Sequence, residues 1–225
     1  VNVDMRQFKK LRMFLHAESI ESNTDGNRLQ DDEMVAFIRF GNDFTDNFYQ
    51  VEMPLKVTPH GASTPEEVWP SENEIELPLD LLTKLKILSL QNDPIIIVEP
   101  NGIGYVEEEA IGSSDNRLTL GIKGNPNFGL VRTLMIGVKN AKTGAIETES
   151  IRGEVWFNEL RMSDMDNKGG YAAVANLDTN FADFANVSAT TRVSTIGFGA
   201  LEQGPNERSR EDVFQYDIVT NLNLG

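Results

Sequence analysis

The sequence lacks cysteine altogether, and its only histidines are His16 and His60. Disulfide bonds, thiolate metal sites and a cysteine nucleophile are therefore excluded. No apolar run approaches the ~20 residues that a membrane-spanning helix needs. The chain opens on Val1-Asn2-Val3-Asp4 rather than on the basic and apolar segments of a signal peptide. We therefore expect an internal piece of a longer protein, and a large cysteine-free domain is compatible with export to an oxidising compartment.

Basic residues are also scarce. The sequence has 20 lysines and arginines against 35 acidic residues, which gives a formal net charge of −15 at pH 7. A chain this acidic repels phosphate backbones, so we expect no nucleic-acid partner. The same charge disfavours electrostatic docking on an anionic membrane surface.

The residue types that enzymes use for catalysis form no recognisable group. His16 lies inside an apolar segment and His60 lies between Pro and Gly, so we expect one packed and one solvated side chain. Ser114-Asp115-Asn116 and Lys142-Thr143-Gly144 resemble two motifs of penicillin-recognising enzymes, but no serine is followed three residues later by lysine. The prediction is a protein that is not an enzyme and that uses no cofactor.

One polar loop, 21–32, partly matches a calcium-binding template. Its oxygen-bearing residues and one glycine fall at template positions 1, 3, 5, 6 and 12. These residues are Glu21, Asn23, Asp25, Gly26 and Asp32. Position 12 is the shorter Asp rather than Glu, position 8 is Arg28, and strands rather than helices are expected on both sides. We therefore expect a plain polar loop and no metal site, although the sequence leaves calcium binding by this loop open.

Short β-prone segments separated by clusters of Gly, Asn, Asp and Pro run through most of the chain. The expected strands are residues 11–17, 34–40, 48–57, 95–98, 118–122, 130–138 and 154–162. Leucines at every third position favour instead a helix over 78–90, covering an edge or end of the sheet. Many short strands with few helices predict an all-β fold, a β-sandwich with jelly-roll-like strand order. We expect this domain to span residues 1–165.

The remaining segment, 166–225, changes character. Small or apolar residues alternate with mostly polar ones in a hairpin over 173–194 and again in a strand over 213–225. The hairpin has a short turn at 183–186, and a polar loop, 195–212, precedes the last strand. Segments of about ten residues with this alternation are typical of outer-membrane β-barrel strands. A soluble sandwich with one solvated face produces the same alternation, so that alternative stays open.

In a barrel, the apolar set of each strand faces the lipid. The predicted membrane-facing residues are Leu177, Phe181, Val187, Val193, Tyr216, Ile218, Leu222 and Leu224.

The most specific pattern lies between residues 153 and 173. It reads Gly153-Glu154-Val155-Trp156-Phe157-Asn158-Glu159-Leu160-Arg161 and continues to Lys168-Gly169-Gly170-Tyr171. Further strings of the same kind are Leu11-Arg12-Met13-Phe14-Leu15-His16-Ala17-Glu18, Phe37-Ile38-Arg39-Phe40-Gly41-Asn42-Asp43-Phe44, Val68-Trp69-Pro70 and Phe181-Ala182-Asp183-Phe184. In this order they resemble the gliding-motility and type IX secretion translocon family (SprA/Sov) of Bacteroidetes outer membranes, over nearly the whole chain.

The resemblance implies a function as well as a fold. Members of that family are very large outer-membrane β-barrels that pass folded cargo to the cell surface and carry domains inserted between barrel strands. The chain would be one inserted sandwich followed by barrel strands, a non-catalytic structural part of a protein-export channel in the outer membrane. Its partners would be the rest of the same barrel, other secretion-system proteins and the exported cargo. Because short barrel turns usually face the periplasm, the 183–186 turn implies an outer-facing sandwich.

A second interpretation is a carbohydrate- or protein-binding β-sandwich module of a cell-surface protein. Trp69 and Tyr105 would then form an aromatic platform for the ligand. A Trp next to Pro in a loop also serves as a packing lid, and a concave site cannot be identified from sequence.

Overall fold

The computed structural model describes residues 2–20, 29–113, 117–141, 152–165, 168–204 and 207–223. The chain divides into unit 1, Val1–Met165, and unit 2, Asp166–Gly225, and each is described by itself. Both units consist mainly of antiparallel β-sheet, which confirms the predicted all-β class. Of the helices in the described ranges, none is long and apolar enough to cross a membrane.

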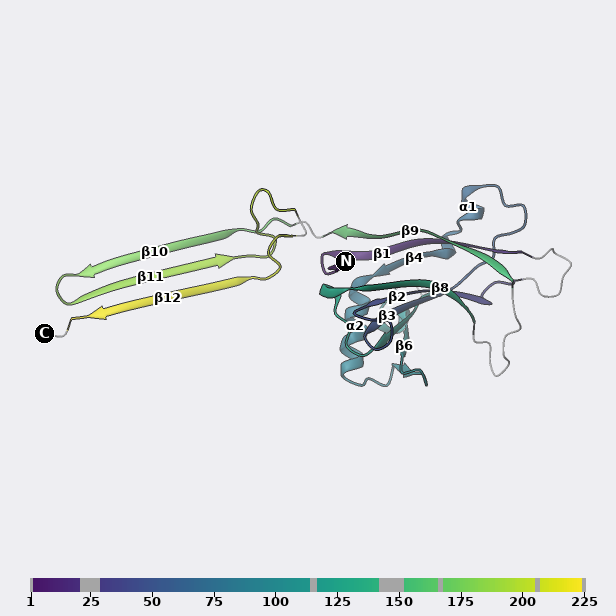
Figure 1. Cartoon of the computed structure of the whole chain (residues 1–225), viewed down its shortest axis with the longest axis horizontal. Helices are drawn as coiled ribbons and strands as arrows, with labels where there is room; N and C mark the ends of the chain where they lie inside the picture. The colour runs from purple at the N-terminus through teal and green to yellow at the C-terminus, as the bar shows by residue number, and fades with distance from the viewer. Residues whose placement is uncertain are drawn as a thin grey trace. The chain divides into compact units, whose positions relative to one another are not determined.

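Unit 1 is a sandwich of two antiparallel sheets (Figure 1). Its strands are β1 Phe8–Ser19, β2 Met34–Gly41, β3 Phe48–Pro54, β4 Glu74–Pro78, β5 Ile97–Val98, β6 Gly104–Glu107, β7 Thr119–Lys123, β8 Thr133–Asn140 and β9 Gly153–Met165. The smaller sheet has the order β4-β1-β9, and the larger has the order β5-β6-β7-β3-β2-β8. The predicted sandwich is therefore confirmed, whereas the jelly-roll order is not.

The core lies between the two sheets because alternate residues of the strands are apolar. On β1, Leu11, Met13 and Leu15 are buried, and Lys10 and Arg12 point to the opposite face. The buried residues of the facing strands β2 and β3 are Ala36, Ile38, Phe40, Val51 and Met53. Burying a side chain of this size contributes about 1.5–3 kcal/mol, so this layer is what holds the sheets together.

The predicted helix is confirmed as α2, Leu79–Leu90, which buries Leu79, Leu82 and Leu85 in the same core. It ends where Asn92 adopts a left-handed backbone conformation with φ of 53°. The N–H of the next residue, Asp93, then donates to the carbonyl oxygen of Leu88, as in a Schellman cap. Shorter helical turns are α1 Pro65–Val68, η1 Ser71–Asn73, η2 Glu108–Ile111 and η3 Phe128–Leu130.

Three strands depart from the sequence-based expectations. The strands β4 and β6 were not among the predicted segments. The predicted 95–98 strand is reduced to the two residues of β5, and both Ile97 and Val98 are exposed. The apolar run therefore marks an edge of the larger sheet and not a buried strand, because β5 has only one neighbour, β6.

The turn between β2 and β3 is organised by one carboxylate, that of Asp43. Its Oδ1 accepts hydrogen bonds from the backbone N–H groups of Thr45, Asp46 and Asn47, and its Oδ2 accepts one from the Asn47 side chain. The side-chain bond from Asn47 and the backbone bonds favour the charged form, so they lower the pKa of Asp43 far below its ordinary value of 3.8.

We expect Asp43→Ala to lower the urea midpoint of the chain at pH 7. A carboxyl group whose pKa is depressed by folding contributes stability that is fully present above the unfolded pKa and is lost as the pH falls through the folded pKa. The difference in midpoint between the natural chain and the variant should therefore shrink as the pH falls below about 4. A difference that stays constant from pH 7 to pH 2.5 would contradict this role for the Asp43 carboxylate.

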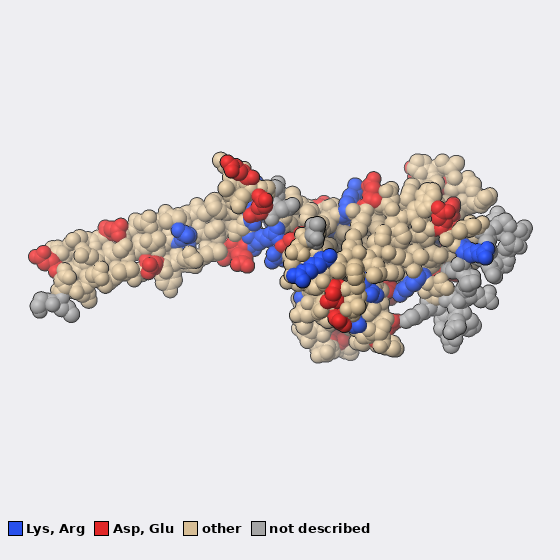
Figure 2. Space-filling model, in the orientation of Figure 1, with Lys and Arg blue, Asp and Glu red and all other residues tan. Residues whose placement is uncertain are grey.

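Unit 2 is a single three-stranded antiparallel sheet with the order β10-β11-β12. Its strands are β10 Ala172–Phe181, β11 Ala185–Ser194 and β12 Val213–Leu222. A short turn joins the first two strands, and a long connection over 195–212 joins the last two. Charged side chains are few along these strands (Figure 2). Among its described residues only Ala185 is buried, so the sheet has no core of its own.

Candidate functional site

The sheet of unit 2 separates apolar and polar residues onto opposite faces. Directly paired residues of neighbouring strands point to the same face, and the registers place Leu177 beside Ala189 and Ala189 beside Ile218. The apolar face contains Ala173, Ala175, Leu177, Thr179, Phe181, Ala185, Val187, Ala189, Thr191, Val193, Phe214, Tyr216, Ile218, Thr220 and Leu222. Seven of the eight residues predicted to face the membrane therefore share this face, and Leu224 lies outside the described residues.

The opposite face of this sheet is mostly polar, although it also contains Ala172, Val174, Val213 and Val219. Its cross-strand row Asn176–Thr190–Asp217 lies next to the apolar row of Leu177. The hydroxyl of Ser188 donates to the carboxylate of its paired residue Asp178 at 2.6 Å. Because the side-chain period of a strand is two, a slip of one residue in either strand pair would abolish this segregation.

Aromatic side chains lie toward both ends of the strands on the apolar face. Phe181 ends β10, and Phe214 and Tyr216 lie near the start of β12, with ring centroids 6.2 Å apart. The register places Phe181 beside Ala185 and Phe214 beside Val193, so these rings occupy opposite ends of the sheet. Tyr216 is 73% exposed and Ile218 is 64% exposed. A face this apolar and this exposed suits an apolar environment.

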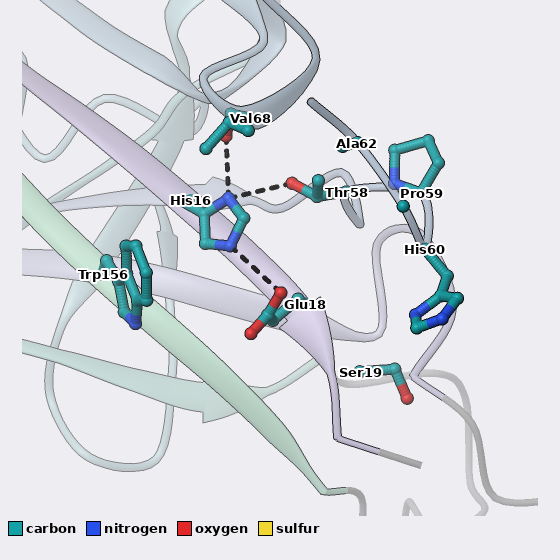
Figure 3. Close-up of a pocket in the computed structure, with 10 residues that line it drawn as sticks. His16, Glu18, Ser19, Thr58, Pro59, His60, Ala62, Val68 and Trp156 are labelled. Atoms are coloured by element: carbon teal, nitrogen blue, oxygen red, sulfur yellow. Dashed lines mark hydrogen bonds and ion pairs between the residues drawn. The ribbon is translucent and has the colours of Figure 1, made fainter. Parts of the chain in front are cut away.

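A polar pocket of about 190 Å³ lies on unit 1 beside His16. His16 is on β1, and its side chain is only 4% exposed. Figure 3 shows its ring between the carbonyl of Val68, the hydroxyl of Thr58 and the carboxylate of Glu18. Trp156, which is paired directly with His16 across β1 and β9, lines the pocket as well. The expected packed histidine is thus confirmed, and the sequence did not indicate that a pocket lies next to it.

The other predicted binding residues are dispersed. His60 is exposed, as expected, and lines the same pocket from the loop that follows β3. Trp69 packs on the ring of His16 with centroids 5.8 Å apart, as a lid would. Tyr105 belongs to β6 of the other sheet, where its hydroxyl donates to Glu52. The prediction that Trp69 and Tyr105 form one aromatic platform is therefore wrong, because Trp69 packs on β1 of the smaller sheet and Tyr105 belongs to β6 of the larger sheet.

Tyr105 belongs to a polar network on the larger sheet. Glu52 also accepts from the side-chain amide of Gln50 and pairs with Lys139 at 2.6 Å. Burial, followed by the charge of Glu52, raises the pKa of the Tyr105 hydroxyl well above its ordinary value. Gln50, Glu52, Tyr105 and Lys139 thus hold one another on this sheet.

The calcium template lies mostly outside the described residues, since 21–28 are not described. Asp32, its last position, has a φ of 67° and forms an ion pair with Lys56 at 2.8 Å. In the ranges that the structure describes, no group of three or more His, Asp or Glu side chains is arranged to hold a metal ion. The two enzyme-like strings at 114–116 and 142–144 also lie outside the described residues.

The whole chain matches a known protein family. The SprA_N family, described as motility related/secretion protein, matches residues 1–225 and so includes both units. Among curated proteins, nothing matches the chain.

Proposed function

Because this chain belongs to the SprA_N family of motility related/secretion proteins, we propose that it is a non-catalytic structural part of an outer-membrane channel that exports proteins. Such a channel would serve type IX secretion and gliding motility. A motility and secretion family works at the cell envelope. Within the envelope, we place this protein in the outer membrane and at the cell surface. The partners would be the rest of the same large barrel, other secretion-system proteins and the exported cargo.

The observation that carries this proposal is the two-faced sheet of unit 2. Its strands have 10 residues each, and 10 extended residues measure about 33 Å. Tilted by about 40°, such strands cover the apolar band of about 25 Å that outer-membrane strands present to lipid. Aromatic residues toward both ends fit the interfacial girdles of such barrels. The free edges of β10 and β12 would pair with neighbouring barrel strands.

The lengths of the two connections suggest an orientation. The turn between β10 and β11 is short, and the connection between β11 and β12 is long. Outer-membrane barrels usually have short periplasmic turns and long external loops. The strand β10 would then run inward, and unit 1, which precedes it in the chain, would be on the outer side of the membrane.

This orientation has a direct test in intact cells. The loop over 58–73 is exposed at His60 and Gly61, and an added Cβ at Gly61 would meet open space. We expect an epitope inserted between Gly61 and Ala62 of the full-length protein to be stained by antibody without permeabilisation. The control is an epitope in the 183–186 turn, which should be stained only after the outer membrane is opened. The reverse staining pattern would overturn the proposed orientation.

A further inference from the structure

The pocket beside His16 brings several hydrogen-bond acceptors together around one imidazole ring. The Nδ1 atom of His16 lies 2.7 Å from the carbonyl oxygen of Val68. A carbonyl oxygen can only accept, so Nδ1 carries the proton and donates it. The hydroxyl oxygen of Thr58, 3.0 Å from the same nitrogen, can share that proton only as a second acceptor. In the neutral ring, Nε2 is then left as an acceptor.

That acceptor meets another acceptor. Nε2 of His16 lies 3.6 Å from Oε2 of Glu18, whose carboxylate is about half exposed and lines the pocket. No hydrogen lies between a neutral Nε2 and a carboxylate oxygen, so in that state a donor from outside would complete the pair, whereas protonation of His16 would turn it into a direct ion pair. Glu18 also lies directly opposite Glu154 in the pairing of β1 with β9. Like charges at directly opposed positions are destabilising, and a cation between or beside them would relieve the repulsion.

One wall of the pocket is an indole ring. Trp156 is 48% exposed, and its centroid lies 5.0 Å from that of His16. Its Nε1–H already donates to the carboxylate of Glu154, so Trp156 contributes its aromatic ring and not its donor to the pocket lining. In Figure 3 the ring stands beside the pocket, across from the Pro59–Ala62 side of the loop that bears His60. An aromatic face next to carboxylates is a favourable setting for a cation.

From these contacts we propose that the pocket binds a basic side chain, that of an arginine in a partner polypeptide. A guanidinium group supplies planar donors for the carboxylate of Glu18 and for Nε2 of His16, and it stacks on an indole ring. A pocket of about 190 Å³ accommodates one side chain and not a folded element. The site goes beyond the channel role and does not depend on it, since it follows from the geometry of unit 1 alone.

The natural chain carries its own reporter of this site. Its two tryptophans, Trp69 and Trp156, both contact the ring of His16. We expect N-acetyl-arginine amide, titrated into the 225-residue chain, to shift the indole N–H resonance of Trp156 in a saturable manner at millimolar concentration. N-acetyl-lysine amide should bind more weakly, because an ammonium group does not stack in the same way. N-acetyl-glutamate amide and methyl glucoside should not bind.

A matched pair of variants tests whether arginine binds at this pocket. Glu18→Gln removes the charge but keeps the size of the side chain, and we expect it to weaken arginine binding on the order of tenfold. Glu66→Gln removes the same charge from exposed helix α1, outside the pocket, and should leave binding unchanged. Equal weakening by both variants would show a nonspecific charge effect and overturn the proposal.

Two further outcomes would also overturn it. Saturable binding of methyl glucoside with no response to the arginine probe would assign the pocket to a neutral sugar. If none of the four probes gives a saturable shift, the pocket is not a binding site for any of them. If Glu18→Gln does not fold, the comparison of the four probes on the natural chain decides the matter alone. Failure of any of these tests leaves the channel proposal standing, because that proposal rests on unit 2.

Discussion

The variant Ile218→Lys is expected to deplete the full-length protein from the outer membrane. Ile218 lies in the middle of β12, in the apolar row with Leu177 and Ala189. If this face meets lipid, the row lies near the middle of the bilayer, where a lysine on the lipid-facing side of a barrel costs about 2–4 kcal/mol. The expected result is a smaller folded, heat-modifiable band in the outer-membrane fraction, measured by immunoblot.

The matched control is Thr190→Lys. Thr190 lies in the adjacent row on the polar face, paired with Asn176 and Asp217, so both substitutions introduce the same charge at the same depth. On the polar side of a barrel such a change is tolerated, and Asp217 lies beside the new lysine. We expect normal amounts of this variant in the membrane. Equal depletion of both variants, or of neither, would contradict the assignment of the apolar face to lipid.

The second large effect is expected in the sandwich. Leu15 is 1% exposed, lies on β1 in the centre of the smaller sheet and pairs with Phe157 of β9. Replacement by alanine removes buried apolar contacts and leaves a cavity, which typically costs about 2–5 kcal/mol. We therefore expect Leu15→Ala to lower the free energy of unfolding of unit 1 by that amount.

Urea unfolding followed by tryptophan fluorescence measures this change. Both tryptophans are in unit 1, so the signal reports the sandwich and not unit 2. Lys9→Ala, an exposed change on the same strand, is the control and should alter the free energy of unfolding by less than about 0.5 kcal/mol. A Leu15→Ala effect as small as that of the control would show that the layer between the sheets is not the stabilising core.

Strands with strong alternation were predictable from the sequence, and strands that depend on distant partners were not. The alternation of Leu11, Met13 and Leu15 marks β1 without any tertiary information. The missed strand β4 has only five residues, and its two glutamates, Glu74 and Glu76, make its sequence look like that of a polar loop. These two carboxylates form ion pairs with Arg12 and Lys10 of β1, more than sixty residues away in the chain. Such long-range pairing is invisible in a local pattern.

The apolar face of unit 2 and the pocket beside His16 also differ in how far the sequence predicts them. The apolar face of unit 2 was predictable, because period-two alternation alone assigns residues to a face. The pocket beside His16 was not, because β1, the 58–62 loop, Val68 and β9 meet there only in the folded sandwich. The sequence identified His16 as packed and Trp69 as a possible lid. It carried no signal that Trp156 lies across the strand pair from His16.

The most direct test of the central claim is the location and size of the natural protein. An antibody raised against this 225-residue chain should be used on separated outer-membrane, inner-membrane and soluble fractions of the cells that produce it. The proposed role predicts a signal in the outer-membrane fraction, in a polypeptide far longer than this chain. A signal confined to the soluble fraction, in a polypeptide no longer than 225 residues, would contradict it.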